Sequence, residues 1–578
     1  MPAWARRLAR PSQAYPRRFV PADIDLGSWQ AIEPLLKDLE ERPLPDSPAF
    51  LQWLQDWWEF GDALGEESSR RYILMTCDTG DKERESAYLH FVETIEPNLA
   101  PYHDRLNRKA VSHPDLAQLD ENIYGAWRRS LQTNIELFSE ANIPLYTELS
   151  KLSQTYQKTC GDMSVDWDGE KKTLSQLAPY LQDPDRSIRE KAWRASAERR
   201  LQDAQKLSDL FDQMLQLRER IAANAGMDDF VAYSFKSYLR TDYGPEECQA
   251  YHRAVKEAVV PVFREALEMR RRQMGLDVLR PWDLSCDPLG RPPLKPFSKS
   301  EDLVGGVGRI FARLDPELAG MYKGMVDLGV MDLDNRQGKA PGGYQCGLSE
   351  VRQPFIFMNS VGMDGDVYTL LHESGHAFHY LLARDLNPPF NRSAPMEFSE
   401  VASMSMERLG ASFLEEFYTP EEKSRSLRQA DEEVFRLLSW VALIDAFQHW
   451  IYTTPHDQES RKAKWVELES IYGADVDWTG LEAYRPNAWH RQLHIFEVPF
   501  YYIEYGIAQL GALQVWQHAR GDVKKALDLY KRGLKMGGSR GLKALFEGTG
   551  LKFDFSSQGI APLLAQVRKD WLQTFEAG

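Results

Sequence analysis

The sequence predicts a mainly α-helical molecule built in two parts, with a small β-sheet beside a helix that carries paired histidines. Four long stretches, residues 28–63, 84–108, 115–159 and 186–226, repeat apolar residues at spacings of three and four with charged residues between them. That period is typical of amphipathic helices. A chain of 578 residues is too long for one hydrophobic core. We therefore expect an N-terminal helical domain over residues 1–185 and a larger second domain, which contains the paired histidines, over residues 186–578.

Shorter elements follow in chain order. Residues 164–170 predict a hairpin with an Asp-Gly turn, and together with Asp183-Pro184 this hairpin marks the boundary near residue 185. Residues 245–275 predict another long helix, which Pro261 kinks or splits. A proline-rich connection over residues 286–296 separates that helix from the rest.

A glycine-rich loop and a β-prone run come next. Gly342 and Gly343 allow close approach of another backbone, and Tyr344 follows them. The run that follows, residues 353–359, carries Pro354 near its start, which favours an edge strand. An edge strand can bind an extended peptide by main-chain pairing.

The helix that carries the histidines is predicted from Asp364 or Asp366, as its N-cap, to a stop at Pro388-Pro389. Leucine, alanine and phenylalanine side chains flank both sides of the histidine stripe, so the helix is buried. Buried histidines are costly unless their nitrogens are satisfied, and a metal ion satisfies both.

The pentapeptide His372-Glu-Ser-Gly-His376 gives that helix its chemistry. At 100° per residue the two histidines lie about 40° apart, so both imidazoles can bind one tetrahedral zinc ion. Glu373 lies too far round the helix to bind easily, yet near enough to take a proton from a zinc-bound water. The pattern predicts a metallopeptidase with one Zn²⁺ per chain.

A third ligand is expected on a second helix, after the proline break. The metzincin pattern fails because it needs Gly at position 379 and His at 382, where this chain has His379 and Leu382. We expect Glu400 to be the ligand, with Glu397 and Glu407 as competitors. Glu407 is two turns on from Glu400 and could instead hold a zinc-binding histidine in place.

These motifs resemble the oligoendopeptidase F branch of the thimet oligopeptidase superfamily, whose members carry a His-Glu-Xaa-Gly-His helix followed by a Glu-Val-Ala-Ser helix. Here the second motif is Glu400-Val401-Ala402-Ser403. The resemblance implies that Glu400 binds zinc. It also implies two parts that enclose a deep channel, which admits short unfolded peptides. His379 matches a histidine common after the family's motif, and we expect it to support the site rather than to bind the metal.

The resemblance extends to both sides of the metal motifs. Gly342, Gly343 and Tyr344 are similar to the family's glycine-rich loop on the substrate side. Downstream, His494 matches a histidine that contacts the substrate. Tyrosine hydroxyls follow it in the family and polarise the scissile carbonyl. Tyr505 is the best match for that role, Tyr502 lies one turn earlier, and Tyr501 is a rival in contact with substrate.

The resemblance and the motif together predict an endopeptidase in which Glu373 transfers protons. Two alternatives stay open. One is a zinc exopeptidase, either a carboxypeptidase or an aminopeptidase, and the other is a catalytically silent peptide-binding protein.

Composition restricts the partners and the compartment. The net charge of −16 argues against nucleic acid, and no run of 18 apolar residues exists to span a bilayer. Five dispersed cysteines fit reduced thiols in the cytoplasm. The first ten residues contain arginines but no apolar core, which indicates a basic arm rather than a secretory signal. The sequence does not predict an oligomeric state.

Overall fold

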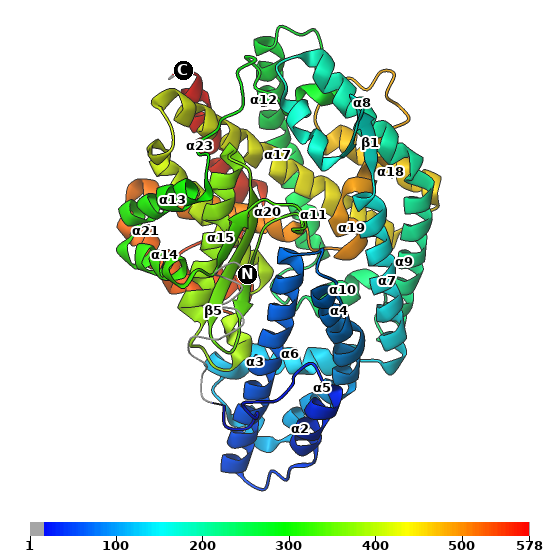
Figure 1. Cartoon of the computed structure of the whole chain (residues 1–578), viewed down its shortest axis with the longest axis vertical. Coiled ribbons are helices and arrows are strands. Elements are labelled where there is room, and N and C mark those ends of the chain that lie inside the picture. The colour runs from blue at the N-terminus through cyan, green and yellow to red at the C-terminus, as the bar shows by residue number, and fades with distance from the viewer. Residues whose placement is uncertain (1–16, 577–578) are drawn as a thin grey trace. The chain divides into compact units, whose positions relative to one another are not determined.

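The computed structural model describes residues 17–576, and this part of the chain is mostly α-helix with five short strands (Figure 1). The prediction of a mainly α-helical fold is confirmed. No helix in the described range combines the length and the apolar character needed to cross a bilayer. The basic arm predicted for the first ten residues lies outside the described residues.

The described chain folds into two compact units, and each unit is assembled from three segments. Among the described residues, the first unit comprises 17–138, 295–420 and 511–553. The second comprises 139–294, 421–510 and 554–576. The units therefore interleave along the chain. The boundary near residue 185 stays a prediction.

The first unit opens with a group of N-terminal helices, shown in blue in Figure 1. Their shared core is rich in aromatic residues, among them Phe50, Trp53 and Trp127. The α-helices of this unit are α2 (Trp29–Glu41), α3 (Ser47–Cys77), α4 (Lys82–His90), α5 (Glu96–Ser112), α6 (Glu121–Leu137), α13 (Ser300–Leu314), α14 (Pro316–Leu328), α15 (Asp364–Ala383), α16 (Met396–Gly410), the end of α20 (Ile503–Gly521), α21 (Val523–Leu534) and α22 (Leu542–Gly548).

The sheet of the first unit has the order β3-β5-β4, with β3 (Met331–Asp334), β4 (Tyr344–Leu348) and β5 (Gln353–Ser360). The expected edge strand is wrong, because β5 lies in the centre and β4 is at the edge. Pro354 is tolerated there because β3 pairs with β5 only from Ile356 onward. The missing N–H of Pro354 therefore costs no bond to β3.

The start of α15 also differs from its prediction. The helix begins at Asp364 after Met363, so neither expected aspartate is the N-cap. Asp366 instead accepts hydrogen bonds from the backbone N–H groups of Val361 and Met363, at 2.8 and 2.9 Å. A carboxylate in the first turn also suits the positive end of the helix dipole.

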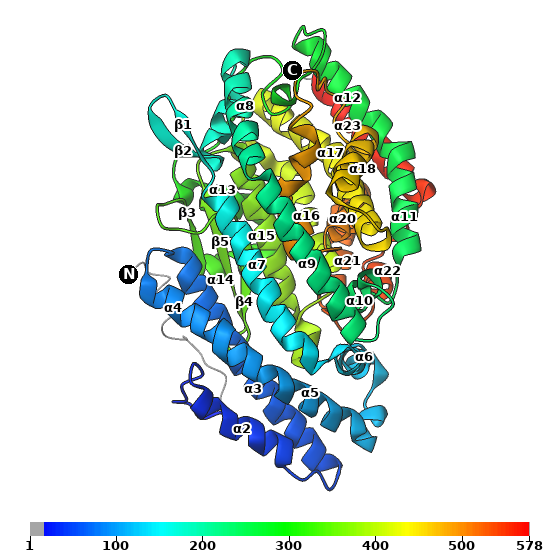
Figure 2. The same ribbon diagram turned by 90° about the vertical axis from the view of Figure 1, so that its right-hand side faces the viewer.

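The second unit is a helical assembly with one small hairpin, in which α7 and α9 lie side by side (Figure 2). The hairpin pairs β1 (Ser164–Trp167) with β2 (Glu170–Thr173), and Asp168 and Gly169 both have positive φ, as its predicted turn requires. The α-helices are α7 (Ile143–Gly161), α8 (Arg186–Gln202), α9 (Ala204–Asn224), α10 (Phe230–Ser237), α11 (Pro245–Ala254), α12 (Val260–Gln273), α17 (Pro420–Thr453), α18 (Gln458–Tyr472), α19 (Leu493–Glu497), the start of α20 and α23 (Ser557–Glu576).

The predicted break at Pro261 is present. A π-helical turn, Val255–Val259, separates α11 from α12, and Pro261 lies in the first turn of α12. Pro261 has no N–H to bond back to the preceding π-helical turn, so it interrupts the hydrogen bonds of the helix at this junction.

Candidate metal centre and substrate-side residues

Three side chains of the first unit bring metal-binding atoms together. His372 and His376 come from α15, and Glu400 comes from α16. One donor atom from each lies within 4.8 Å of the other two. Glu400 Oε2 is 3.3 Å from His372 Nε2 and 3.6 Å from His376 Nε2. Ligands at 2.0–2.1 Å from a tetrahedral zinc ion lie about 3.3 Å apart, so this donor set fits zinc.

Glycine within the motif allows the two helices to approach. A Cβ placed on Gly375 would lie 2.6 Å from Ser403 Cα and 2.7 Å from Ala402 O. Only a residue without a side chain fits against the α16 backbone at this distance. The serine of the second motif contributes as well, because Ser403 Oγ donates to Glu400 Oε2 at 2.9 Å. The motifs therefore fix the backbone spacing in addition to the donors.

The competing glutamates lie elsewhere. Glu407 Oε1 is 2.6 Å from His372 Nδ1, on the ring nitrogen that faces away from Glu400. Glu397 is buried, and it belongs to neither group of converging donor atoms found among the described residues. The geometry favours Glu400 as the third donor and gives Glu407 the orienting contact.

Electrostatics at the donor cluster favour a cation. Burial alone would lower the pKa of His372, but the carboxylates of Glu400 and Glu407 outweigh it and raise that pKa well above its ordinary value. Burial lowers the pKa of His376 to about 4. Burial acts to raise the pKa of Glu400, and the two histidines overcome it and lower that pKa to about 2. Without a metal ion, a proton on His372 supplies the positive charge that the two carboxylates favour. A metal ion has to displace this proton in order to bind.

Glu373 is a buried carboxyl group beside these donors. Its side chain is 6% exposed, and burial raises its pKa to about 7. Its Oε2 atom has no hydrogen-bond partner among the described residues. A carboxylate with a raised pKa and a free acceptor oxygen is suited to general base catalysis near neutral pH.

His379 lies one turn beyond the motif and is also buried. Its ring meets Phe398 edge to face at 5.8 Å, and burial lowers its pKa to about 3. Its Nε2 atom has no hydrogen-bond partner in residues 17–576. A neutral ring packed against α16 fits support of the helix pair.

The glycine-rich loop lies next to Glu373. A Cβ on Gly343 would be 3.6 Å from Glu373 Oε1, and Gly342 has a left-handed φ of 97°. The Asn359 amide donates to the carbonyls of Ala340 and Gly342, at 2.8 and 2.9 Å, and so shapes the loop. The edge strand β4 begins directly after it, and alternate residues of an edge strand direct N–H and C=O groups away from the sheet.

The side chain of Tyr344 has its own partners within the first unit. Its hydroxyl is 2.6 Å from Thr76 Oγ1, and its ring stacks on Phe357 at 4.7 Å. What Tyr344 offers to a substrate is therefore its backbone.

The second unit holds the predicted histidine and tyrosines as one cluster of rings. His494 on α19 lies with its ring centroid 5.9 Å from Tyr501, 4.7 Å from Tyr502 and 5.9 Å from Tyr505. Tyr505 in turn contacts the other two tyrosines at 5.6 and 5.3 Å. Burial raises the pKa of Tyr502, which keeps its hydroxyl protonated as a donor.

A short relay orients His494, and sequence reasoning missed it. Trp440 Nε1 donates to Gln492 Oε1 at 3.0 Å, so the Gln492 amide nitrogen faces His494 Nδ1 at 2.8 Å. Burial lowers the pKa of His494 to about 4, so the ring is neutral at pH 7. Since Nδ1 accepts from the amide, the proton is on Nε2, which becomes an N–H donor. Gln492 is two residues before His494, but Trp440 is remote in sequence and no motif marks it.

Comparisons with known proteins give matches along most of the chain. A model described as "Peptidase family M3" matches residues 179–562, and one described as "Peptidase M3 N-terminal domain" matches residues 27–138. An oligoendopeptidase F homolog of Lactococcus lactis is 26% identical over 219 residues, which span 38% of this chain and 32% of the relative. One of Borreliella burgdorferi is 22% identical over 532 residues and 85% of each chain.

Solved structures share the fold over nearly the whole chain. A structure described as an oligoendopeptidase F is 27% identical, with a TM-score of 0.87, and the match covers 96% of this chain and 99% of the other. The structure of PZ peptidase A with an inhibitor is 24% identical, with a TM-score of 0.90 and coverage of 97% and 100%.

Proposed function

The chain belongs to peptidase family M3, and we propose that it is a zinc-dependent endopeptidase that hydrolyses internal bonds of short unfolded peptides. The observation that carries the proposal is the convergence of His372, His376 and Glu400 beside a buried carboxyl group. Zinc held by these three residues would lower the pKa of a water molecule and polarise the scissile carbonyl.

Glu373 is the proton carrier in this proposal. Its free Oε2 atom takes the proton of the attacking water, and its carboxylic acid then delivers that proton to the leaving amine. The raised pKa supports both steps, because a group with a pKa near 7 accepts and releases a proton at neutral pH. Glu407 holds the His372 ring, which keeps Nε2 directed at the metal position.

The substrate is held by its main chain. We assign the outer edge of β4, with Gly342 and Gly343, to pairing with an extended peptide. The close approach of Gly343 to Glu373 supports this assignment, since a peptide bound there runs past the proton carrier. Main-chain pairing depends little on side chains, which suits a peptidase that accepts varied short peptides.

Oxyanion stabilisation is assigned to the ring cluster of the second unit. Negative charge develops on the former carbonyl oxygen, and a tyrosine O–H or an imidazole N–H directed at it lowers the barrier. The family resemblance and the donor tautomer of His494 support His494 and Tyr505 in this role, with Tyr502 beside them and Tyr501 in contact with substrate.

The cellular setting is part of the same proposal. No disulfide joins the five cysteines, all of which lie in the described range. Reduced thiols are typical of the cytoplasm, where we place the enzyme.

A peptide blocked at both ends tests the proposal. An internally quenched peptide with an acetylated N-terminus and an amidated C-terminus is a substrate for an endopeptidase only, so we expect chelator-sensitive cleavage at an internal bond. Glu373→Gln is the matched control for contaminating peptidases. Cleavage restricted to peptides with a free terminus would establish an exopeptidase, and binding without cleavage by zinc-loaded protein would establish a silent peptide-binding protein.

A further inference from the structure

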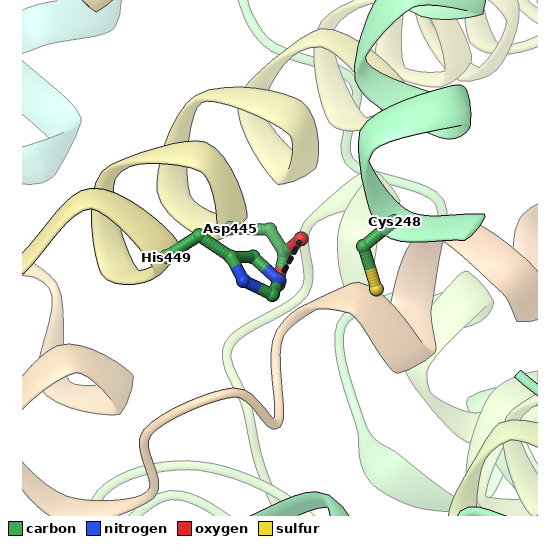
Figure 3. A group of neighbouring side chains, drawn as sticks. All are labelled: Cys248, Asp445 and His449. Carbon is green, nitrogen blue, oxygen red and sulfur yellow. Dashed lines mark ion pairs between the residues drawn. The ribbon is translucent and has the colours of Figure 1, made fainter. Parts of the chain in front are cut away.

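A second group of metal-binding side chains lies within the second unit, on α11 and α17 (Figure 3). Cys248 and His252 are four residues apart on α11, and Asp445 and His449 are four residues apart on α17. Residues at this spacing share one face of a helix. Two helices thus each contribute a pair of donors to one place.

The separations within the group suit a bound ion. The donor atoms of Cys248, Asp445 and His449 lie within 4.8 Å of one another. His449 Nε2 is 3.4 Å from Asp445 Oδ2, close to the spacing of about 3.3 Å between ligands of a tetrahedral zinc ion. His252 Nε2 is nearer to the same oxygen, at 2.7 Å, which is a hydrogen-bond distance.

Burial of these polar side chains without a bound ion destabilises the fold. Cys248 is 1% exposed, Asp445 is 0% exposed and His449 is 8% exposed. In the part of the chain that the structure describes, Asp445 Oδ1 lacks a hydrogen-bond partner, and His449 Nε2 has no hydrogen bond beside its ion pair with Asp445 Oδ2. Aromatic rings surround the imidazole, with Phe500 at 5.1 Å and Phe235 at 5.9 Å. Buried polar atoms without hydrogen bonds are destabilising, and one cation would satisfy both of them.

We propose that Cys248, Asp445 and His449 bind a zinc ion that joins α11 to α17. A sulfur donor beside nitrogen and oxygen donors favours zinc over calcium or magnesium, which take oxygen ligands. A thiolate and a carboxylate together neutralise the two charges of the ion, so the buried site carries no net charge. His252 donates to the carboxylate and holds its orientation, as a hydrogen-bonded partner of a metal ligand does.

This zinc can be distinguished from the one in the proposed function. The donors of the metal centre in the first unit, His372, His376 and Glu400, include no sulfur. A thiolate bound to Co²⁺ gives a charge-transfer absorption in the near ultraviolet, which nitrogen and oxygen ligands do not give. Cobalt-loaded protein therefore reports the two sites separately.

The experiment uses the full-length protein. We expect about two zinc ions per chain in the wild type and about one in His372→Ala/His376→Ala, by elemental analysis. The double variant loaded with Co²⁺ should keep the charge-transfer band, and Cys248→Ser should lose it in either background. Cys286→Ser is the matched control, because Cys286 is also buried in the second unit and should leave the band unchanged.

The wild-type spectrum decides the question even if Cys248→Ser does not fold. His449→Gln gives a second test, and it should also lose the band. If the wild type shows no thiolate band and the double variant holds no zinc, the group is an ion-pair network of Asp445 with its two histidines and the inference fails. A band that persists in folded Cys248→Ser would also overturn it.

Discussion

His372 Nδ1 lies 2.6 Å from Glu407 Oε1, and this contact determines which nitrogen of the ring faces the other donors. With Nδ1 held by the carboxylate, Nε2 is directed at Glu400, 3.3 Å away. Glu400 and Glu407, both on α16, therefore face opposite nitrogens of one imidazole. Substitutions of these two glutamates should therefore affect zinc binding differently.

Glu400→Ala should abolish tight zinc binding, because it removes one of three donors. Glu407→Ala should weaken zinc binding by about 10- to 100-fold, since it only releases the His372 ring. Competition with a chromophoric chelator measures both affinities. If Glu407→Ala lost more affinity than Glu400→Ala, the assignment of the third ligand would be wrong.

Gly375→Ala should disturb the metal centre without touching a donor. Its Cβ would lie 2.6 Å from Ser403 Cα, so α16 must move and carry Glu400 with it. We expect a loss of about 1–3 kcal/mol in stability and weaker zinc binding. Gly365→Ala, on the same helix, meets nothing within 4 Å and is the control. Equal melting temperatures and zinc affinities for the two variants would contradict the packing argument.

Glu373→Gln separates chemistry from binding. Glutamine keeps the size of the side chain but has no basicity, so zinc and peptide should still bind while turnover falls by several orders of magnitude. Full activity of this variant on a doubly blocked peptide would exclude the mechanism.

The pH dependence of wild-type activity should follow from the ionisation of Glu373. Glu373 acts as a base only when it is deprotonated, so kcat/KM should be high above its pKa and fall as the pH drops through it. Burial raises that pKa to about 7, and a zinc ion nearby acts in the opposite direction. We expect an acid limb with a midpoint at or below about pH 7. Activity that rises as the pH falls from 7 to 5 would exclude Glu373 as the base.

The convergence of His372, His376 and Glu400 could be predicted from the sequence because local spacing sets most of it. His372 and His376 share a helix face, and Glu400 and Glu407 share another, so the helix period alone places four of the side chains. The packing of α15 against α16 then depends on small residues, and one of these, Gly375, is part of the motif. Local rules were sufficient here because only two helices build the centre.

The strand order and the contacts between distant segments could not be predicted from the sequence. The strand order depends on β3, which pairs with β5 in parallel and lies before the glycine loop in sequence. Pro354 therefore indicated an edge although β5 is central. Trp440 and Gln492 meet only in the folded chain, as do Cys248 and Asp445, and a single sequence has no pattern that joins such pairs.

Gln492→Glu tests the relay to His494. A carboxylate accepts from Trp440 and also from His494 Nδ1, so it should shift the proton to Nδ1 and raise the pKa of the ring. We expect kcat to fall by up to about 10², with zinc content unchanged. Gln492→Met removes the contact without reversing the tautomer and should cost less. An unaltered NMR titration of His494 in Gln492→Glu would contradict the relay.

Tyr505→Phe removes one hydroxyl from the ring cluster and tests its assignment to the oxyanion. The ring contacts with Tyr501 and Tyr502 are retained, so the fold should not change. If the hydroxyl stabilises the developing negative charge, kcat should fall by about 10² to 10³ with little change in peptide affinity. Tyr501→Phe and Tyr502→Phe are the matched controls, because each removes one hydroxyl from the same cluster. If Tyr505→Phe stayed near wild type while either control lost its turnover, the oxyanion donor would be that tyrosine, and the zinc and Glu373 assignments would stand.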